Sequence, residues 1–73
     1  MSKLAIISPG NMVEILMKLG FEELRQRGSH RFFAHKDGRT TTIPDHNEDL
    51  GRGLIRKILK DIEISIDEYN KLR

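Results

Sequence analysis

A histidine stands among arginines near the middle of this 73-residue chain, in the run Gly28-Ser29-His30-Arg31. The unperturbed pKa of a histidine side chain lies near neutrality, so an imidazole can take up or release a proton at physiological pH. RNA carries its own nucleophile, the 2′-hydroxyl. Cleavage of RNA therefore needs only a proton acceptor, a proton donor and cations around the phosphate. The residue types at this position suit that chemistry, with His30 as acid or base.

Other residues are candidates for supporting roles. His46, in the run Pro44-Asp45-His46, is a candidate for a second proton-transfer group if the chain folds it near His30. The alternative for His30 is a histidine at the start of a strand that hydrogen-bonds a backbone carbonyl, since lone histidines are seldom catalytic. The candidates for contacts to RNA and its phosphates are Arg27, Ser29, Arg31, Lys36, Arg52, Arg56, Lys57 and Lys60.

The histidines do not have the spacing of a metal site. No two of His30, His35 and His46 lie three or four residues apart, as ligands on one helix would. The chain has no cysteine, which excludes disulfides and thiolate zinc sites. It also lacks a phosphate-binding glycine loop and a His-Glu-x-x-His motif. We therefore expect neither a metal nor a cofactor.

Length and charge restrict the class of protein. The chain is too short for two cores, so we expect a single domain, 1–73. Its apolar runs are shorter than a signal-peptide core or a membrane span, which predicts a soluble, cytoplasmic protein. The 13 Lys and Arg residues crowd mainly into 25–39 and 52–60, although the formal net charge is only +2. A segregated positive face attracts phosphate backbones, but ordinary solvated surface charge gives the same pattern.

Two long helices are predicted to flank the centre of the chain. Ser8-Pro9 is a typical helix start, apolar residues then recur at i, i+3, i+4 and i+7 from Met12 to Leu19, and Gly20 follows as the stop signal. A second apolar stripe runs over 54–62, with basic residues on its other side. The run Ser65-Ile66-Asp67-Glu68 is a capping box, which predicts a short last helix.

The segment between these helices is predicted to be an antiparallel meander of three strands. The strands are expected over 21–27, 30–35 and 40–43, with a hairpin at Asp37-Gly38. The first is mostly polar, which is typical of a sheet edge. Phe32 and Phe33 must face opposite sides of the sheet, so one belongs to the core. The other either covers the second face, the commoner role, or stacks on a base.

These motifs together resemble the HicA family of toxin mRNA interferases, the toxic halves of bacterial and archaeal toxin–antitoxin pairs. The resemblance runs nearly from end to end of the chain. It rests above all on Gly28-Ser29-His30, followed by strand aromatics, and on the distance of this element from Pro44-Asp45-His46. Leu19-Gly20-Phe21 and the Arg56-Lys57-Ile58-Leu59 helix opened by Gly53 also match, but helices are less specific.

The resemblance implies an α+β fold like that of the double-stranded-RNA-binding domain: α-β-β-β-α, with a three-stranded antiparallel sheet packed on two helices, plus a short C-terminal helix. It implies a metal-independent endoribonuclease that cleaves mRNA, with His30 at the position of the family's catalytic histidine. It also implies a HicB-type antitoxin that binds and blocks the enzyme. One departure is Leu54, which follows Gly53 where the family usually has Thr or Ser. A hydroxyl contact to phosphate at this position is therefore expected to be missing, although N–H groups at the helix start can still receive an anion.

Two other functions remain open. A non-catalytic RNA-binding module that uses the basic helix would bind RNA in a salt-sensitive way without cleaving it. A protein-interaction domain would instead use the basic face to bind an acidic partner and would show no affinity for RNA.

Overall fold

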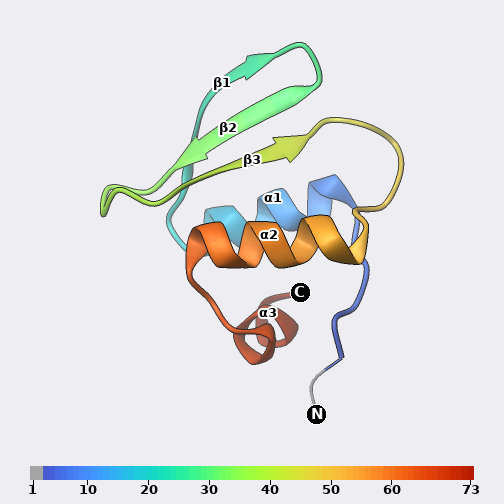
Figure 1. The fold of residues 1–73 in the computed structure, drawn as a ribbon. Coiled ribbons are helices and arrows are strands. Elements are labelled where there is room, and N and C mark those ends of the chain that lie inside the picture. Colours follow the sequence, from blue (N-terminus) through green and yellow to red (C-terminus); the bar gives the residue numbers. More distant parts are fainter. Residues whose placement is uncertain (1–2) are drawn as a thin grey trace.

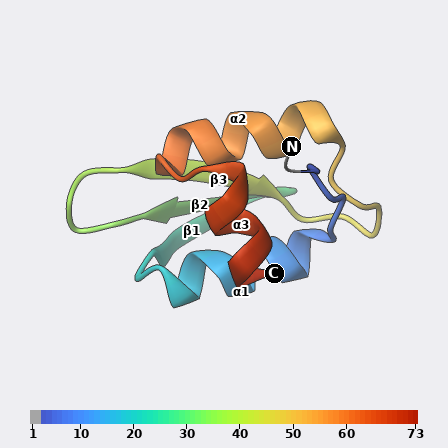
Figure 2. The ribbon, with the colours of Figure 1, turned by 90° about the horizontal axis from the view of Figure 1, so that it is seen from below.

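The computed structural model describes residues 3–73, which form three layers. The elements are α1 (Pro9–Lys18), β1 (Glu22–Arg27), β2 (His30–Ala34), β3 (Thr40–Pro44), α2 (Arg52–Ile62) and α3 (Ile66–Leu72). The sheet covers α1 and α2, and α3 lies across these two helices on the side away from the sheet (Figures 1 and 2). The predicted α-β-β-β-α order with an added C-terminal helix is confirmed, and it is the order of the double-stranded-RNA-binding domain.

The helix ends lie where the capping residues predict them. The Ser8 hydroxyl accepts a hydrogen bond from the Asn11 N–H at 3.1 Å, and Pro9 occupies the first turn of α1. Gly20 follows the C-cap with φ of 94°, a conformation that glycine adopts with little strain. In α3 the Ser65 hydroxyl accepts from the Glu68 N–H at 3.1 Å. Local side-chain chemistry thus sets these boundaries.

The sheet is a meander in the order β1-β2-β3, with β2 paired to both neighbours in antiparallel register. β1 is an edge strand, as its polar sequence predicts, and all six of its residues are exposed. Phe33 is buried against the helices, whereas its neighbour Phe32 is half-buried on the other side of the sheet. The predicted division of the two phenylalanines between the two faces is confirmed.

A β-bulge at Leu24 decides what the edge strand presents on each face. The pairing is regular from Arg27 to Arg25 and then skips Leu24, so that Glu23 instead of Leu24 lies opposite the buried Phe33. An extra residue in one strand of a pair moves the following side chains to the other face. Leu24 is therefore not part of the core, and its side chain is 64% exposed.

The core lies between the sheet and the helices and is apolar. Tyr69 of α3 closes its far side, and the Tyr69 hydroxyl donates a hydrogen bond to the Ala5 carbonyl. Among residues 3–73 no helix is long and apolar enough to cross a membrane. The buried apolar residues are Leu4, Ile7, Met12, Ile15, Leu16, Phe21, Phe33, Ile43, Leu50, Ile55, Ile58, Leu59, Ile62 and Tyr69.

Candidate functional site

His30 is the first residue of the central strand and lies at one end of the sheet. Its register partners are Arg27 of β1 and Pro44 of β3. Cross-strand partners share a face, and Phe32, two residues on, faces away from the helices. We call the sheet surface that faces away from α1 and α2 the open face; His30 and Arg27 both lie on it. The His30 side chain is exposed, and no group in residues 3–73 hydrogen-bonds its imidazole. The alternative role, in which its ring is bound to a backbone carbonyl, is not observed within the part of the chain that the structure describes.

The turn that precedes His30 is held by the loop that follows β3. The Asp45 N–H donates to the Ser29 carbonyl at 2.6 Å. The Gln26 side-chain amide donates to the Asp45 carboxylate at 2.7 Å and to the Gly28 carbonyl at 3.1 Å. Gly28 has φ of 58°, in the left-handed region that favours glycine. This bracing fixes the backbone at His30 without using its side chain.

Arg31, although adjacent to His30, lies on the opposite face of the sheet. Its register partner is the buried Ile43, and its guanidinium lies 5.6 Å from the centroid of the Phe33 ring. Two hydrogen bonds, of 2.8 and 2.7 Å, join this guanidinium to the Glu23 carboxylate. Arg31 therefore enters any phosphate contact only by giving up or sharing this ion pair.

The Glu23–Arg31 pair gives a prediction about acid pH. Hydrogen bonding to Arg31 lowers the pKa of the Glu23 carboxyl below its ordinary value. The pair therefore contributes stability above the unfolded-state pKa, and this contribution is lost as the pH falls through the lowered folded-state pKa. In Arg31→Gln we expect the pKa of Glu23 to rise towards that of an ordinary glutamate. An NMR titration of the carboxyl carbons measures this, and an unchanged Glu23 pKa would contradict the ion pair.

His46 lies in the loop between β3 and α2, which begins beside the His30 turn. Its Nδ1 accepts a hydrogen bond from the Glu48 N–H at 3.2 Å, and the residue is exposed. Nδ1 is therefore the nitrogen engaged within the loop, and Nε2 is the one that points to no partner among residues 3–73. The β1–β2 turn, this loop and the start of α2 all lie at the same end of the molecule (Figure 1).

Lys36 lies at the other end of the sheet. It belongs to the hairpin between β2 and β3, where the Gly38 N–H donates to the His35 carbonyl at 2.9 Å. Six residues of extended chain separate Lys36 from His30, which corresponds to roughly 20 Å. His35, at the same end, is held by the Asp37 N–H on its Nδ1 at 3.1 Å and meets the Phe21 ring edge-on. The structure does not bring either side chain to His30.

The basic residues of α2 form an exposed surface on the helix. Arg52, Arg56 and Lys60 recur every fourth residue, so they lie on one side of α2. Lys57 is exposed too but donates to the Asp61 carboxylate at 3.1 Å. Leu54 packs partly buried against the core. Within residues 3–73 no side chain caps the start of α2, where Gly51 is the N-cap.

Sequence reasoning did not identify Arg25 as a neighbour of Phe32. The two are cross-strand partners, and the Arg25 guanidinium lies 5.0 Å from the centroid of the Phe32 ring. The alternation of side chains along β2 places Phe32 on the face of His30. The partner on β1 depends on the tight Gly28-Ser29 turn, which sets the register.

The described part of the chain brings no group of three or more His, Asp or Glu side chains into an arrangement that could hold a metal ion. What lies beside His30 on the open face is a cation, Arg27. The arrangement offers proton transfer and positive charge at the end of a sheet.

Comparison with known proteins identifies the family. A search of curated proteins finds no match. The model of the HicA toxin family, toxins of bacterial toxin–antitoxin systems, matches residues 11–64, which extend from α1 to the residues after α2 and include the whole sheet. This match covers well over half of the chain and contains His30, His46 and the basic helix. The chain therefore belongs to the HicA toxin family.

Proposed function

We propose that this toxin is a metal-independent endoribonuclease that cleaves mRNA in the cytoplasm, with His30 as a proton-transfer group. The observation that carries the proposal is the position of His30: exposed, bound to no group among residues 3–73, and opposite Arg27 at the end of the sheet. An imidazole held by a braced backbone but free at both nitrogens is available to a substrate. Family membership supports the toxic role and a protein partner.

The chemistry follows from the RNA. A base removes the proton of the 2′-hydroxyl, the oxygen attacks the adjacent phosphorus, and the bond to the 5′-oxygen breaks as an acid protonates that oxygen. The products are a 2′,3′-cyclic phosphate and a 5′-hydroxyl. The base takes up the proton of the 2′-hydroxyl and the acid releases one to the 5′-oxygen, so the protons balance. His30 acts at one of these two oxygens, and His46 is the candidate for the other. Arg27 and the α2 cations Arg52, Arg56 and Lys60 neutralise charge on the phosphates.

A HicB-type antitoxin is the proposed inhibitor. Toxin–antitoxin membership implies a partner protein, and the exposed basic residues of α2 favour an acidic surface on that partner. Blocking the reaction requires that the partner exclude RNA from His30 or from these cations.

The test is cleavage of end-labelled RNA by the purified chain in the presence of a chelator. We expect cleavage to continue when metals are removed, and to stop at any site where the attacking 2′-hydroxyl is replaced by hydrogen, because that oxygen is the nucleophile. Mass spectrometry of the fragments should show 2′,3′-cyclic phosphate ends. RNA that is bound but never cut would favour a non-catalytic binding module, and cleavage that requires an added metal would contradict the mechanism.

A further inference from the structure

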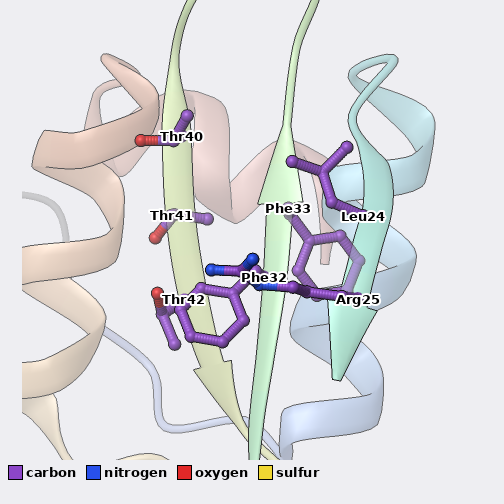
Figure 3. A pocket seen from close by; sticks show the side chains of 7 residues that line it. All are labelled: Leu24, Arg25, Phe32, Phe33, Thr40, Thr41 and Thr42. Atoms are coloured by element: carbon purple, nitrogen blue, oxygen red, sulfur yellow. The ribbon is translucent and has the colours of Figure 1, made fainter. Parts of the chain in front are cut away.

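A shallow hollow lies on the open face around Phe32, two residues along β2 from His30. It has a volume of about 350 Å³. Its walls come from all three strands, and Figure 3 shows the Arg25 side chain crossing β2 towards β3, next to the Phe32 ring. Leu24, moved out of the core by the bulge, stands at its edge and remains 64% exposed. Besides Leu24, Arg25 and Phe32 it is lined by Phe33, Thr40, Thr41 and Thr42.

Two planar groups lie together in this hollow. The Arg25 guanidinium is 5.0 Å from the Phe32 ring centroid. Within residues 3–73 no carboxylate forms an ion pair with Arg25, in contrast to Arg31 and Arg39. Aromatic rings and guanidinium planes are the two side-chain groups on which unpaired nucleobases stack. The pair is thus a ready stacking surface that carries a positive charge.

The hollow lies close to the proposed reaction centre. Phe32 follows His30 by two residues on the same face of β2, a separation of roughly 7 Å along the strand. That is close to the distance between neighbouring nucleotides in an extended chain. A phosphate at His30 therefore brings the base of an adjacent nucleotide over Phe32 and Arg25.

The charge of the open face favours a nucleic acid there. Arg27 and Arg25 occupy successive open-face positions of β1, whereas the strand's one open-face carboxylate, Glu22, lies opposite Ala34 at the far end. The bulge turns Glu23 to the other face, where it binds Arg31. The stretch from His30 to Phe32 is consequently lined by cations, and an RNA strand crossing it meets no nearby negative side chain of β1.

We propose that the nucleobase next to the cleaved phosphodiester stacks on the Phe32–Arg25 pair, and that the substrate is consequently single-stranded RNA. This inference rests on the proposed function and specifies its substrate. In a duplex both faces of each base are covered by its stacked neighbours, so no face is free for Phe32. The commoner role of such a phenylalanine, covering the second side of a sheet, does not account for an unpaired arginine beside it and an exposed leucine at its edge.

The test measures binding, so that it does not depend on cleavage. All proteins in this test carry His30→Ala, which keeps the RNA intact, and the protein with this change alone is called the parent. A short fluorescent oligoribonucleotide is titrated with the parent and with four variants of it: Phe32→Leu, Phe32→Tyr, Arg25→Lys and Lys71→Gln. Phe32→Leu keeps an apolar side chain but removes the ring, and we expect affinity to fall about 5- to 100-fold. Phe32→Tyr should bind like the parent. Arg25→Lys keeps the charge but loses the plane and should bind more weakly. Lys71→Gln, on the distant α3, measures how much affinity is lost when one positive charge far from the hollow is removed.

A set of oligoribonucleotides, each with one base removed, locates the stacked base. If one base stacks on Phe32, its removal should weaken binding to the parent protein but have little further effect on Phe32→Leu, because both changes remove the same contact. The inference would be overturned if removal of each base weakened binding to the parent and to Phe32→Leu by the same factor. It would also be overturned if the parent bound a duplex as tightly as a single strand. A Phe32→Leu protein that binds RNA normally but escapes its antitoxin would assign the hollow to the protein partner instead. A wild-type chain that shows this pattern but cleaves no RNA would refute the proposed catalysis and leave the stacking site standing.

Discussion

Replacement of His30 by alanine is expected to abolish RNA cleavage while leaving the fold intact. The side chain is exposed and contributes no hydrogen bond within residues 3–73, so its removal should change the free energy of unfolding by less than about 0.5 kcal/mol. A general acid or base contributes roughly 100- to 10,000-fold to a rate. We expect cleavage of a labelled RNA to slow by at least that lower factor, and growth arrest on expression in a bacterial host to disappear.

His35→Ala is the matched control, because it removes an imidazole from the other end of the same sheet. His35 contacts the Phe21 ring and accepts a hydrogen bond from the Asp37 N–H. Its loss should lower the urea midpoint but leave cleavage by the folded protein unchanged. His30→Ala is thus expected to lower the cleavage rate without lowering stability, and His35→Ala to lower stability without lowering the cleavage rate. A His30→Ala chain that cleaves RNA at the wild-type rate would remove His30 from the mechanism.

His46→Ala extends the same comparison to the second proposed proton-transfer group. A loss comparable to that of His30→Ala, without loss of stability, would place both imidazoles in the reaction. An unchanged rate would leave the second proton to another group of the protein or to water.

The order of elements could be predicted from local chemistry. The helix boundaries depend on interactions between residues close in the sequence: the caps at Ser8 and Ser65, the stop at Gly20 and the apolar repeat of α1. The sequence pattern alone therefore contains both interacting groups of each contact. The division of Phe32 and Phe33 between two faces follows from strand geometry alone. The position of His30 at a strand start was predictable for the same reason.

The faces on which Leu24 and Glu23 lie could not be predicted, because they depend on a bulge. A bulge arises from how two strands fit, and the polar sequence of β1 has no alternation that would reveal a skipped residue. The bulge places Glu23 beside Arg31 and exposes Leu24. Arg31 and Lys36 are both candidates by closeness to His30 in the sequence. In a strand, however, neighbouring residues point to opposite faces, so Arg31 lies on the other face from His30. Six residues extend over the length of the strand, so Lys36 lies at the other end of the sheet.

Phe33→Ala is expected to remove most of the free energy of unfolding at room temperature. Phe33 is 1% exposed and lies at the centre of the sheet, between Glu23 and the buried Thr41. Removing a buried phenylalanine costs about 3–5 kcal/mol. A domain of this size has roughly 4–11 kcal/mol of stability in total, and its small core places it towards the lower end. Circular dichroism during urea titration should show a greatly lowered midpoint or no folded baseline.

Phe32→Ala is the matched control, since it deletes the same atoms from the adjacent residue. Phe32 is half-buried on the open face, so its removal leaves no closed cavity and should lower stability by much less. Equal losses from the two variants would show that both faces of the sheet are packed to a similar extent, and the open face would then not be free to receive a base. A large loss from Phe33 alone means that one phenylalanine holds the sheet on its helices and leaves the other, on the face of His30, available to RNA.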